Sequence, residues 1–594
     1  MNPSDDLRDL EDVATNQPNI VFILSDDQDA KLNSLDYMPL LQKHLMSKGT
    51  HFQKHYCTVA WCCPSRVSLW TGKAAHNTNV TNVVPPFGGY PQFLDRHLNE
   101  SWVPLWLQEN GYNTYYTGKL MNYHTVDNYN NPYPSGFNGT DFLLDPGTYS
   151  YLNPIFQRNK DAPVNHTNEY NTDLVAKKGL GLIDEAVQGG QGRPFFVTIA
   201  PIAPHADFEI VYTEDHEYVR TINSPPVSAE RHKDLFPDEI VPRTPNFNPL
   251  DKPSGVDFLA ELEPLSDENI TYNDHWHRQR LRSLQVIDEL VEDVVQKLEK
   301  YGILDNTYIF YSSDNGYHIS QHRLQPGKGC GWEEDINVPL IVRGPNIPAG
   351  GVVDFPTSHT DLAPTWFKVL GIPLREDFDG LPIPLTADEI TEWEGSGKAK
   401  EHVQIEFWSD ITGGEYNTPP AGISNPAPDN TYKGLRILGE YYSFYYSVWC
   451  SGSHQLYDMT TDPYQLNNLY QTASSEISSP PTNTTVTICN ANYTLVKVTQ
   501  RLDSLLFVLK TCTGKACSDP WNSLMPNTGI NSLRQAMDPK YDSFFENMKR
   551  VGYERCEGGY IPDAEGEVYE SGDAYQGGEK LRLARDPREW WNRA

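Results

Sequence analysis

Short, continuous apolar runs recur along the first half of the chain, and each one ends in polar residues. Examples are residues 19 to 25 (NIVFILS), 195 to 200 (FFVTIA) and 308 to 313 (YIFYSS). Runs of this length without alternation are typical of strands buried on both faces of a parallel sheet. Ahead of the third run, residues 274 to 301 place apolar side chains at helical spacing and stop at Gly302, which predicts a helix. The pattern favours an α/β fold around a mostly parallel sheet.

Two of these predicted strands end in pairs of oxygen-bearing side chains. The first run is followed by Asp26 and Asp27, and the third by Asp314 and Asn315. Open α/β sheets bind ligands beyond the carboxyl ends of their strands, and hard cations prefer carboxylate and amide oxygens. The alternative for the first pair is a helix N-cap. Because neither Cys nor paired His joins the set, we expect a Ca²⁺ site rather than a Zn²⁺ site, with Mg²⁺ as the alternative.

The stretch from 57 to 73, CTVAWCCPSRVSLWTGK, predicts a loop that enters a helix. Pro64 suits the first turn of a helix, where its missing N–H costs nothing. Cys62 then lies at the helix N-terminus, with Arg66 one turn further along. Free backbone donors and the partial positive charge of that end favour an oxyanion beside Cys62. We therefore predict an anion site with a side-chain nucleophile, the alternative being a disulfide cysteine in a turn.

The same stretch resembles the signature of the sulfatase family. Residues 62 to 66 (CCPSR) and 71 to 73 (TGK) match C-x-P-S-R followed by L-T-G-R/K, with Trp70 where Leu is usual. The resemblance implies an alkaline-phosphatase-like α/β sandwich. It also implies that a formylglycine-generating or sulfatase-maturing enzyme oxidises Cys62 to formylglycine (3-oxoalanine). In that family the hydrated aldehyde is the nucleophile, and the residue also contacts the metal.

Further matches to the family follow in the expected order. Gly-Lys at Lys119 resembles the element whose Lys binds the sulfate, and Pro-His at His205 resembles the element whose His contacts the ester oxygen. The Gly-Lys-Gly sequence at Lys328 matches the second active-site Lys. The family also places a divalent cation on Asp26, Asp27 and the later Asp-Asn pair. On the residues alone, a lone Lys after a strand is usually a solvated surface charge, and a His just past a strand end is as often an ordinary loop residue as a functional one.

One part of the chain departs from the arylsulfatase pattern. Many arylsulfatases have His two residues after the first Lys, where this chain has Met121 and then Asn122, as in relatives that resemble N-acetylglucosamine-6-sulfatases. His124 is near but out of register. The D-N-G-Y-H element that ends at His318 resembles the same relatives and implies an active-site role for this His. His322 receives no family role, and the base that cleaves the hemiacetal intermediate stays unassigned.

The chain divides into three predicted parts: a polar tail (1 to 17), a catalytic domain (18 to 390) and a smaller C-terminal α+β domain (400 to 594). Residues 207 to 265 are rich in Pro and acidic residues, which predicts a surface insertion that walls the pocket. Residues 472 to 487 are Ser/Thr/Pro-rich and predict a linker. We expect three arginines of the predicted helix to lie on its solvated side: Arg278, Arg280 and Arg282.

Charge and hydropathy exclude several classes of protein. A net charge of -32 repels nucleic acids and long polyanions, although a small anion can still enter a locally basic pocket. No run of 18 apolar residues occurs, so no membrane span is predicted. We therefore expect a small sulfate ester as the substrate.

The cysteines and glycosylation sequons bear on the cellular compartment. Nine cysteines fit one modified residue and up to four disulfide bridges, whose pairing stays open. Seven N-x-S/T sequons together with these cysteines favour a secretory route. The first residues show no signal peptide, so the protein is expected to be secreted or lumenal after signal removal, or else intracellular. The sequons lie at Asn79, Asn99, Asn138, Asn165, Asn269, Asn483 and Asn492.

The sequence thus predicts an arylsulfatase that hydrolyses small aryl or sugar sulfate monoesters. One alternative is an N-acetylglucosamine-6-sulfatase. Another is a phosphomonoesterase, phosphodiesterase or phosphonate monoester hydrolase on the same metal site, because a phosphodiester carries the same single charge as a sulfate ester. A non-catalytic binding protein is disfavoured by the complete set of predicted metal ligands beside C-x-P-S-R.

Overall fold

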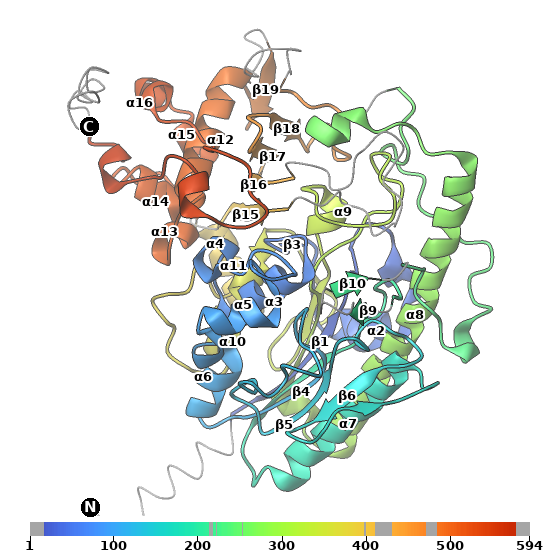
Figure 1. The fold of residues 1–594 in the computed structure, drawn as a ribbon. Coiled ribbons are helices and arrows are strands. Elements are labelled where there is room, and N and C mark those ends of the chain that lie inside the picture. The colour runs from blue at the N-terminus through green and yellow to red at the C-terminus, as the bar shows by residue number, and fades with distance from the viewer. Residues whose placement is uncertain are drawn as a thin grey trace, which may run out of the picture.

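The computed structural model describes residues 17–208, 210–212, 218–220, 223–251, 254–396, 400–409, 430–470 and 484–577. A ten-stranded sheet lies at the centre, in the order β13-β2-β12-β11-β1-β8-β4-β5-β6-β7 (Figure 1). Its strands are β1 (Asn19–Ser25), β2 (Thr50–Phe52), β4 (Asn113–Lys119), β5 (Gly139–Leu143), β6 (Ile155–Arg158), β7 (Val164–Asn165), β8 (Phe195–Ala200), β11 (Thr307–Ser313), β12 (Leu340–Arg343) and β13 (Gly351–Val353).

The middle of this sheet is parallel. Strand β1 pairs in parallel with β11 and β8, and β4 pairs in parallel with β8 and β5, whereas β12 and β6 run antiparallel to their inner neighbours. The register of β1 against β11 sets Ser25 opposite Ser313. Parallel strands end at the same edge, so the polar pairs that follow β1 and β11 must meet there. The predicted α/β fold with a mostly parallel sheet is confirmed.

Side chains of β1 alternate between two cores, one on each face of the sheet. Ile20, Phe22 and Leu24 join the core that contains residues of α3 (Cys62–Thr71), α6 (Val103–Glu109) and α10 (Leu362–Val369). Val21 and Ile23 join the core that contains residues of α2 (Pro39–His44), α7 (Asn171–Gly189) and α8 (Asp267–Lys300). Figure 1 shows these helix groups on opposite sides of the sheet. Burial on both faces explains why β1 is continuously apolar.

The C-terminal region is smaller and built on antiparallel pairing. Its sheet consists of β15 (His402–Phe407), β16 (Tyr432–Gly439), β17 (Tyr442–Trp449) and β18 (His454–Asp458), and residues of α12 (Leu495–Leu509) share a core with it. The predicted domain boundary lies between the middle of α11 (Ala387–Gly395) and the start of β15.

The remaining elements are β3 (His55–Tyr56), β9 (Ile210–Tyr212), β10 (Tyr218–Arg220), β14 (Thr357–Ser358), β19 (Thr485–Ile488), β20 (Ala491–Thr494), α4 (Ala75–Thr78), α5 (Gly89–Asp95), α9 (Glu333–Ile336), α13 (Lys515–Ser518), α14 (Pro520–Leu524), α15 (Leu533–Ala536) and α16 (Asp542–Asn547), with short 3₁₀ turns between them.

Two sequence expectations on local structure need correction. Arg280 is buried in α8 and is only 3% exposed, so its predicted place on the solvated side is wrong. At 3.6 residues per turn, Arg280 shares a face with Leu284 and Ile287, whereas Arg278 and Arg282 lie nearly opposite. The predicted linker ends in strand β19, and most of its residues lie outside the described part of the chain.

Disulfides are present in the C-terminal region. Cys450 pairs with Cys556 and Cys512 with Cys517, and the other five cysteines, including Cys62, are free thiols. Among the sequon asparagines, Asn138, Asn165 and Asn492 are exposed, whereas Asn99 is buried. No helix within the described ranges is long and apolar enough to cross a membrane.

A buried carboxyl makes the stability of the C-terminal region dependent on pH. Burial raises the pKa of Glu401 from 4.5 to about 7, although Tyr442, Trp521 and Leu533 donate hydrogen bonds to it. Between these two values the folded chain keeps a proton that the unfolded chain has released, so stability falls as the pH rises through that window. Gln at position 401 keeps an acceptor but cannot ionise.

We therefore expect Glu401→Gln to flatten the pH dependence of melting. Between about pH 5 and pH 7, the melting temperature of the wild type should fall by roughly 2–4 °C more than that of the variant. Differential scanning fluorimetry at matched ionic strength measures both slopes. Parallel slopes would show that Glu401 does not change its protonation in this range.

Candidate active site

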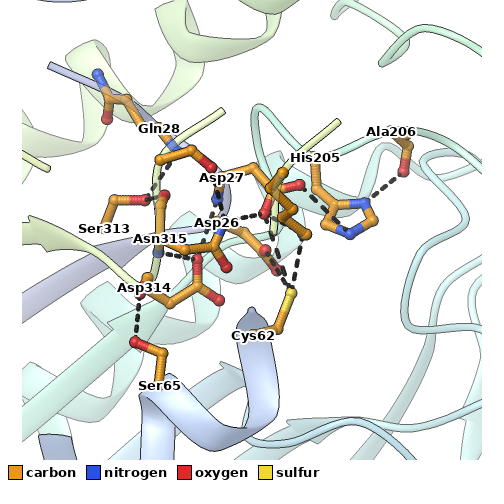
Figure 2. Close-up of polar contacts among 12 residues, drawn as sticks. Asp26, Asp27, Gln28, Cys62, Ser65, His205, Ala206, Ser313, Asp314 and Asn315 are labelled. Carbon is orange, nitrogen blue, oxygen red and sulfur yellow. Dashed lines mark hydrogen bonds and ion pairs between the residues drawn. The ribbon is translucent and has the colours of Figure 1, made fainter. Parts of the chain in front are cut away.

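The two oxygen-bearing pairs meet at the carboxyl edge of the sheet. Asp26 and Asp27 directly follow β1, and Asp314 and Asn315 directly follow β11. Asp314 Oδ1 accepts a hydrogen bond from the Asp27 backbone N–H at 3.1 Å, and Asn315 Nδ2 donates to Asp27 Oδ1 at 2.8 Å. Figure 2 shows the four side chains clustered above the helix that carries Cys62. The structure thus brings together two pairs that lie almost 290 residues apart.

Cys62 is the first residue of helix α3, as its sequence predicts. Its Sγ lies 3.7 Å from Asp26 Oδ1, 3.9 Å from Asp27 Oδ1 and 3.1 Å from Lys328 Nζ. Burial raises the pKa of the Cys62 thiol far above its ordinary value, and the nearby Lys119 opposes this shift only in part. The unmodified thiol is therefore neutral and a weak nucleophile. A nucleophile at this position requires chemistry other than a thiolate.

Arg66 connects the helix to one aspartate of each pair, Asp26 and Asp314. Its Nε donates to Asp314 Oδ2 at 2.7 Å, its Nη2 lies 3.3 Å from Asp26 Oδ2, and its Nη1 donates to the Lys119 carbonyl at 2.6 Å. Burial alone would raise the pKa of Asp314, but the charges of Arg66, Lys119 and Lys328 hold it below its ordinary value. Asp314 is therefore ionised at neutral pH and able to bind a cation.

Two lysines and one histidine complete the cluster. Lys119, the last residue of β4, places its Nζ 2.6 Å from Asp26 Oδ2, and Lys328 Nζ contacts Asp27 Oδ1. His205 Nε2 lies 3.6 Å from Asp27 Oδ2, while Nδ1 donates to the Ala206 carbonyl at 2.9 Å. That second bond directs Nε2 toward the acidic pair (Figure 2). Residues predicted as catalytic thus surround Cys62.

His318 lies beside this cluster on the loop that follows β11. Its Nδ1 is 2.7 Å from Asp335 Oδ1, and its backbone pairs with Gly327, the residue before Lys328. His124 has a different environment: it is buried between the rings of Tyr90 and Phe142, at 4.4 and 5.1 Å. Burial lowers the pKa of His124 to about 3, so it stays neutral and serves packing.

The oxygen atoms at the strand ends fit a hard divalent cation. Ligand atoms of Asp26, Asp27, Cys62 and His205 lie within 4.8 Å of one another, so a cysteine and one histidine border the carboxylates, contrary to the expectation that no cysteine would. Formylglycine at position 62 would place oxygen where the thiol lies. Asn315 Oδ1 is buried and accepts no hydrogen bond from any residue in the described ranges. A buried amide oxygen without a donor is costly unless another group binds it, and a cation would do so. With the carboxylates of the two pairs, this oxygen supplies a donor set of the Ca²⁺ or Mg²⁺ type.

Sequence reasoning missed two residues in contact with this cluster. The Tyr149 ring lies 4.8 Å from Lys119 Nζ and 4.7 Å from the His205 ring, but no sequence pattern marks it. Arg280 donates to the Asp27 backbone carbonyl at 2.6 Å. Its place on the apolar stripe of α8 is visible in the helical spacing and was the available signal.

Comparison with known proteins shows the family to which the chain belongs. The sulfatase family model matches residues 18–372. The chain is 35% identical over 568 residues to an arylsulfatase of Volvox carteri, covering 91% of this chain and 82% of that protein. It is 28% identical over 529 residues to an N-acetylglucosamine-6-sulfatase of Capra hircus, covering 85% of each.

A solved structure shows the same fold. It is described as a complex with its substrate D-glucosamine-2-N,6-O-disulfate, and it superposes with a TM-score of 0.57 at 20% identity, over 76% of this chain and 93% of that one. The family match spans β1 and β11, the Asp26–Asp27 and Asp314–Asn315 pairs that follow these strands, and the helix that begins at Cys62. The chain therefore belongs to the sulfatase family, whose members hydrolyse sulfuric esters, and its family implies formylglycine and a divalent cation.

Proposed function

We propose that this protein is an arylsulfatase that hydrolyses small sulfate monoesters. It would use formylglycine at position 62 and a Ca²⁺ ion held by the Asp26–Asp27 pair and the Asp314–Asn315 pair. The observation that carries the proposal is the position of Cys62 Sγ, 3.1 Å from Lys328 Nζ and within 3.9 Å of both Asp26 and Asp27. A formylglycine formed from Cys62 would lie between the Lys328 ammonium group and the carboxylate oxygens of Asp26 and Asp27, which would bind the metal. That is the environment that attack on a sulfate ester requires.

Formylglycine at position 62 would supply a nucleophilic hydroxyl in its hydrated form, and the cation, when bound, would supply a Lewis acid. The side chains of this chain hold the reactants. Arg66 holds Asp26 and Asp314 through its guanidinium. Lys119, Lys328 and His205 face the space beside Cys62 and would neutralise the sulfate oxygens and the leaving oxygen. His318, oriented by Asp335, would assist at the same end of the site.

The charge of the protein supports a small substrate. The far field of a chain with net charge -32 repels polyanions. In the site itself, Arg66, Lys119 and Lys328 offset the carboxylates of Asp26, Asp27 and Asp314, and a bound divalent cation would make the pocket positive. A singly sulfated aryl or sugar ester therefore enters more readily than a sulfated polysaccharide. Similarity to the arylsulfatase of Volvox carteri over 91% of this chain supports the same choice.

N-acetylglucosamine-6-sulfatase activity is the second candidate. Asn122 occupies the position that such relatives use, and its Nδ2 donates at 2.6 Å to Tyr149, whose ring contacts Lys119. The relative from Capra hircus carries that name. A third reaction, cleavage of a phosphodiester or phosphonate monoester, would use the same cationic side chains because those esters carry the same single charge.

We further propose a secreted or lumenal location. The two disulfides, Cys450–Cys556 and Cys512–Cys517, suit an oxidising compartment, and exposed sequons such as Asn138 and Asn165 would carry glycans there. A formylglycine-generating or sulfatase-maturing enzyme would act on the segment around Cys62 before folding buries it.

Initial rates on matched substrates test the proposal. We expect nitrophenyl sulfate to be cleaved faster than N-acetylglucosamine-6-sulfate, a nitrophenyl phosphodiester or a sulfated polysaccharide at low salt. Added salt shortens the repulsion and should raise the rate on the polysaccharide relative to that on the small ester. Preference for the intact polysaccharide at low salt would contradict the small-ester assignment, and faster cleavage of the phosphodiester would point to the third reaction.

A further inference from the structure

A buried arginine donates hydrogen bonds to two backbone carbonyls beside the candidate active site. Arg280 lies in α8, 3% exposed, and its guanidinium donates to the carbonyl of Asp27 at 2.6 Å and to the carbonyl of Pro204 at 3.3 Å. These carbonyls belong to one proposed cation ligand and to the residue directly before His205. We propose that Arg280 is a positioning residue, which sets the Asp27 carboxylate and the His205 ring relative to each other.

The backbone N–H and C=O of Asp27 show why the hydrogen bond from Arg280 matters. Asp27 has a backbone φ of 67°, a left-handed conformation that non-glycine residues rarely adopt. Its N–H donates to Asp314 Oδ1 at 3.1 Å and its C=O accepts from Arg280, so both sides of the strained residue are held by side chains. Strained conformations persist only where surrounding groups hold them. The conformation of Asp27 directs its carboxylate toward Cys62.

The same guanidinium also organises the neighbouring loops. It packs on the Tyr317 ring, 4.1 Å from its centroid, and Tyr317 directly precedes His318. One helical turn earlier in α8, Trp276 is fully buried in a small core with Tyr317 and Ala206, the residue after His205. Because α8 is a long helix anchored in the core, it holds Arg280 in contact with the segments that follow three strands, β1, β8 and β11.

A charge balance accompanies this placement. Burying a guanidinium is costly unless it is paired, and Arg280 Nη2 lies 3.4 Å from Asp29 Oδ1. The Asp29 carboxyl group thus gives the buried guanidinium an acidic partner beside Asp27. Lysine cannot replace arginine here, because an ammonium group does not reproduce the planar fork that reaches two carbonyls.

The inference rests on the proposed function and is tested with Arg280→Lys, which keeps the charge. The matched control is Arg282→Lys, because Arg282 also donates to a backbone carbonyl, that of Leu235, at 2.6 Å, but away from the site. Cation affinity is measured by calorimetry on cation-free protein titrated with Ca²⁺, and kcat and KM are measured on nitrophenyl sulfate at saturating Ca²⁺. Melting temperatures report stability separately.

We expect Arg280→Lys to weaken Ca²⁺ affinity and to lower kcat/KM at saturating Ca²⁺ by about 10–100-fold each. The Arg282→Lys control should stay within about twofold of the wild type on both measures. A variant with a lower melting temperature but wild-type Ca²⁺ affinity and kcat/KM would overturn the inference and leave Arg280 as a structural residue. A wild-type protein that binds no cation or cleaves no sulfate ester would instead refute the proposed function.

A second comparison separates positioning from charge imbalance. Arg280→Met leaves Asp29 without its partner, whereas Arg280→Met combined with Asp29→Asn removes both charges. If Arg280 positions Asp27 and His205, the double variant stays about 10-fold or more impaired in Ca²⁺ affinity and kcat/KM. Recovery to wild-type values in the double variant would show that the unpaired carboxylate caused the loss, and would overturn the inference.

Discussion

Cys62→Ala is expected to lower kcat/KM on a small sulfate ester by about 10⁴-fold or more, because alanine has no thiol to oxidise and cannot be converted to the proposed formylglycine nucleophile. Folding should survive, since the change removes a single sulfur at the start of α3 and leaves Arg66 and its ion pairs in place. Steady-state kinetics on nitrophenyl sulfate, with circular dichroism as a check on folding, measures both effects.

Cys63→Ala is the matched control for this prediction. Cys63 is adjacent and fully buried, but it packs in the apolar core with Val67 and Leu69. We expect the Cys63 variant to keep activity and to lose only some stability. Fragment masses from tandem mass spectrometry of the peptide that spans positions 62 and 63 should show conversion at Cys62 alone. An inactive Cys63→Ala protein beside an active Cys62→Ala protein would show that the assigned register is wrong.

Removal of the cation is expected to lower activity by at least about 100-fold, and Ca²⁺ or Mg²⁺ should restore it. The carboxylates of Asp26, Asp27 and Asp314 face a site where Asn315 Oδ1 accepts no hydrogen bond from the described residues. Without a cation, these oxygens are balanced only by the lysines and Arg66. Chelation followed by gel filtration and back-titration with each cation measures the effect. Full activity in metal-free protein would contradict the proposed cation site.

Asp314→Asn tests which residues hold that cation. The variant keeps an oxygen for the Asp27 N–H but loses the charge that pairs with Arg66. We expect both the metal content and the rate to fall by about 10–100-fold. Asp274→Asn is a fitting control, because Asp274 is also buried and paired, with Arg243 at 2.6 Å, outside the site. Metal content is measured by elemental analysis after dialysis against a limiting Ca²⁺ concentration.

Much of the catalytic region could be predicted from residue patterns. The apolar run at 19 to 25 and the run at 308 to 313 both proved to be buried, adjacent parallel strands. A strand covered on both faces is predominantly apolar, with small polar residues such as Ser25 and Ser313 at its end, and charged residues are favoured where the chain leaves the sheet. The positions of the Asp26–Asp27 pair and the Asp314–Asn315 pair follow from this rule, because each pair begins where its apolar run stops.

Other parts could not be predicted, because their determinants are contacts between distant segments. The pairing Cys450–Cys556 depends on how the C-terminal segment returns to β17, and nothing local to either cysteine encodes it. The base for the second half of the reaction is similarly unassigned: His124 proved to be enclosed by Tyr90 and Phe142 rather than placed in the site.

The amino-acid order alone therefore predicted the strands, the helix that begins at Cys62 and the residue types of the proposed anion and cation site, because these follow from local periodicity and short motifs. Folding settled which of those residues touch. Lys328 reaches Cys62 across 266 positions, and Arg280 reaches Asp27 across 253. Local pattern reports only whether a side chain faces inward, whereas its partner depends on strand order and helix placement, which are properties of the whole packed chain.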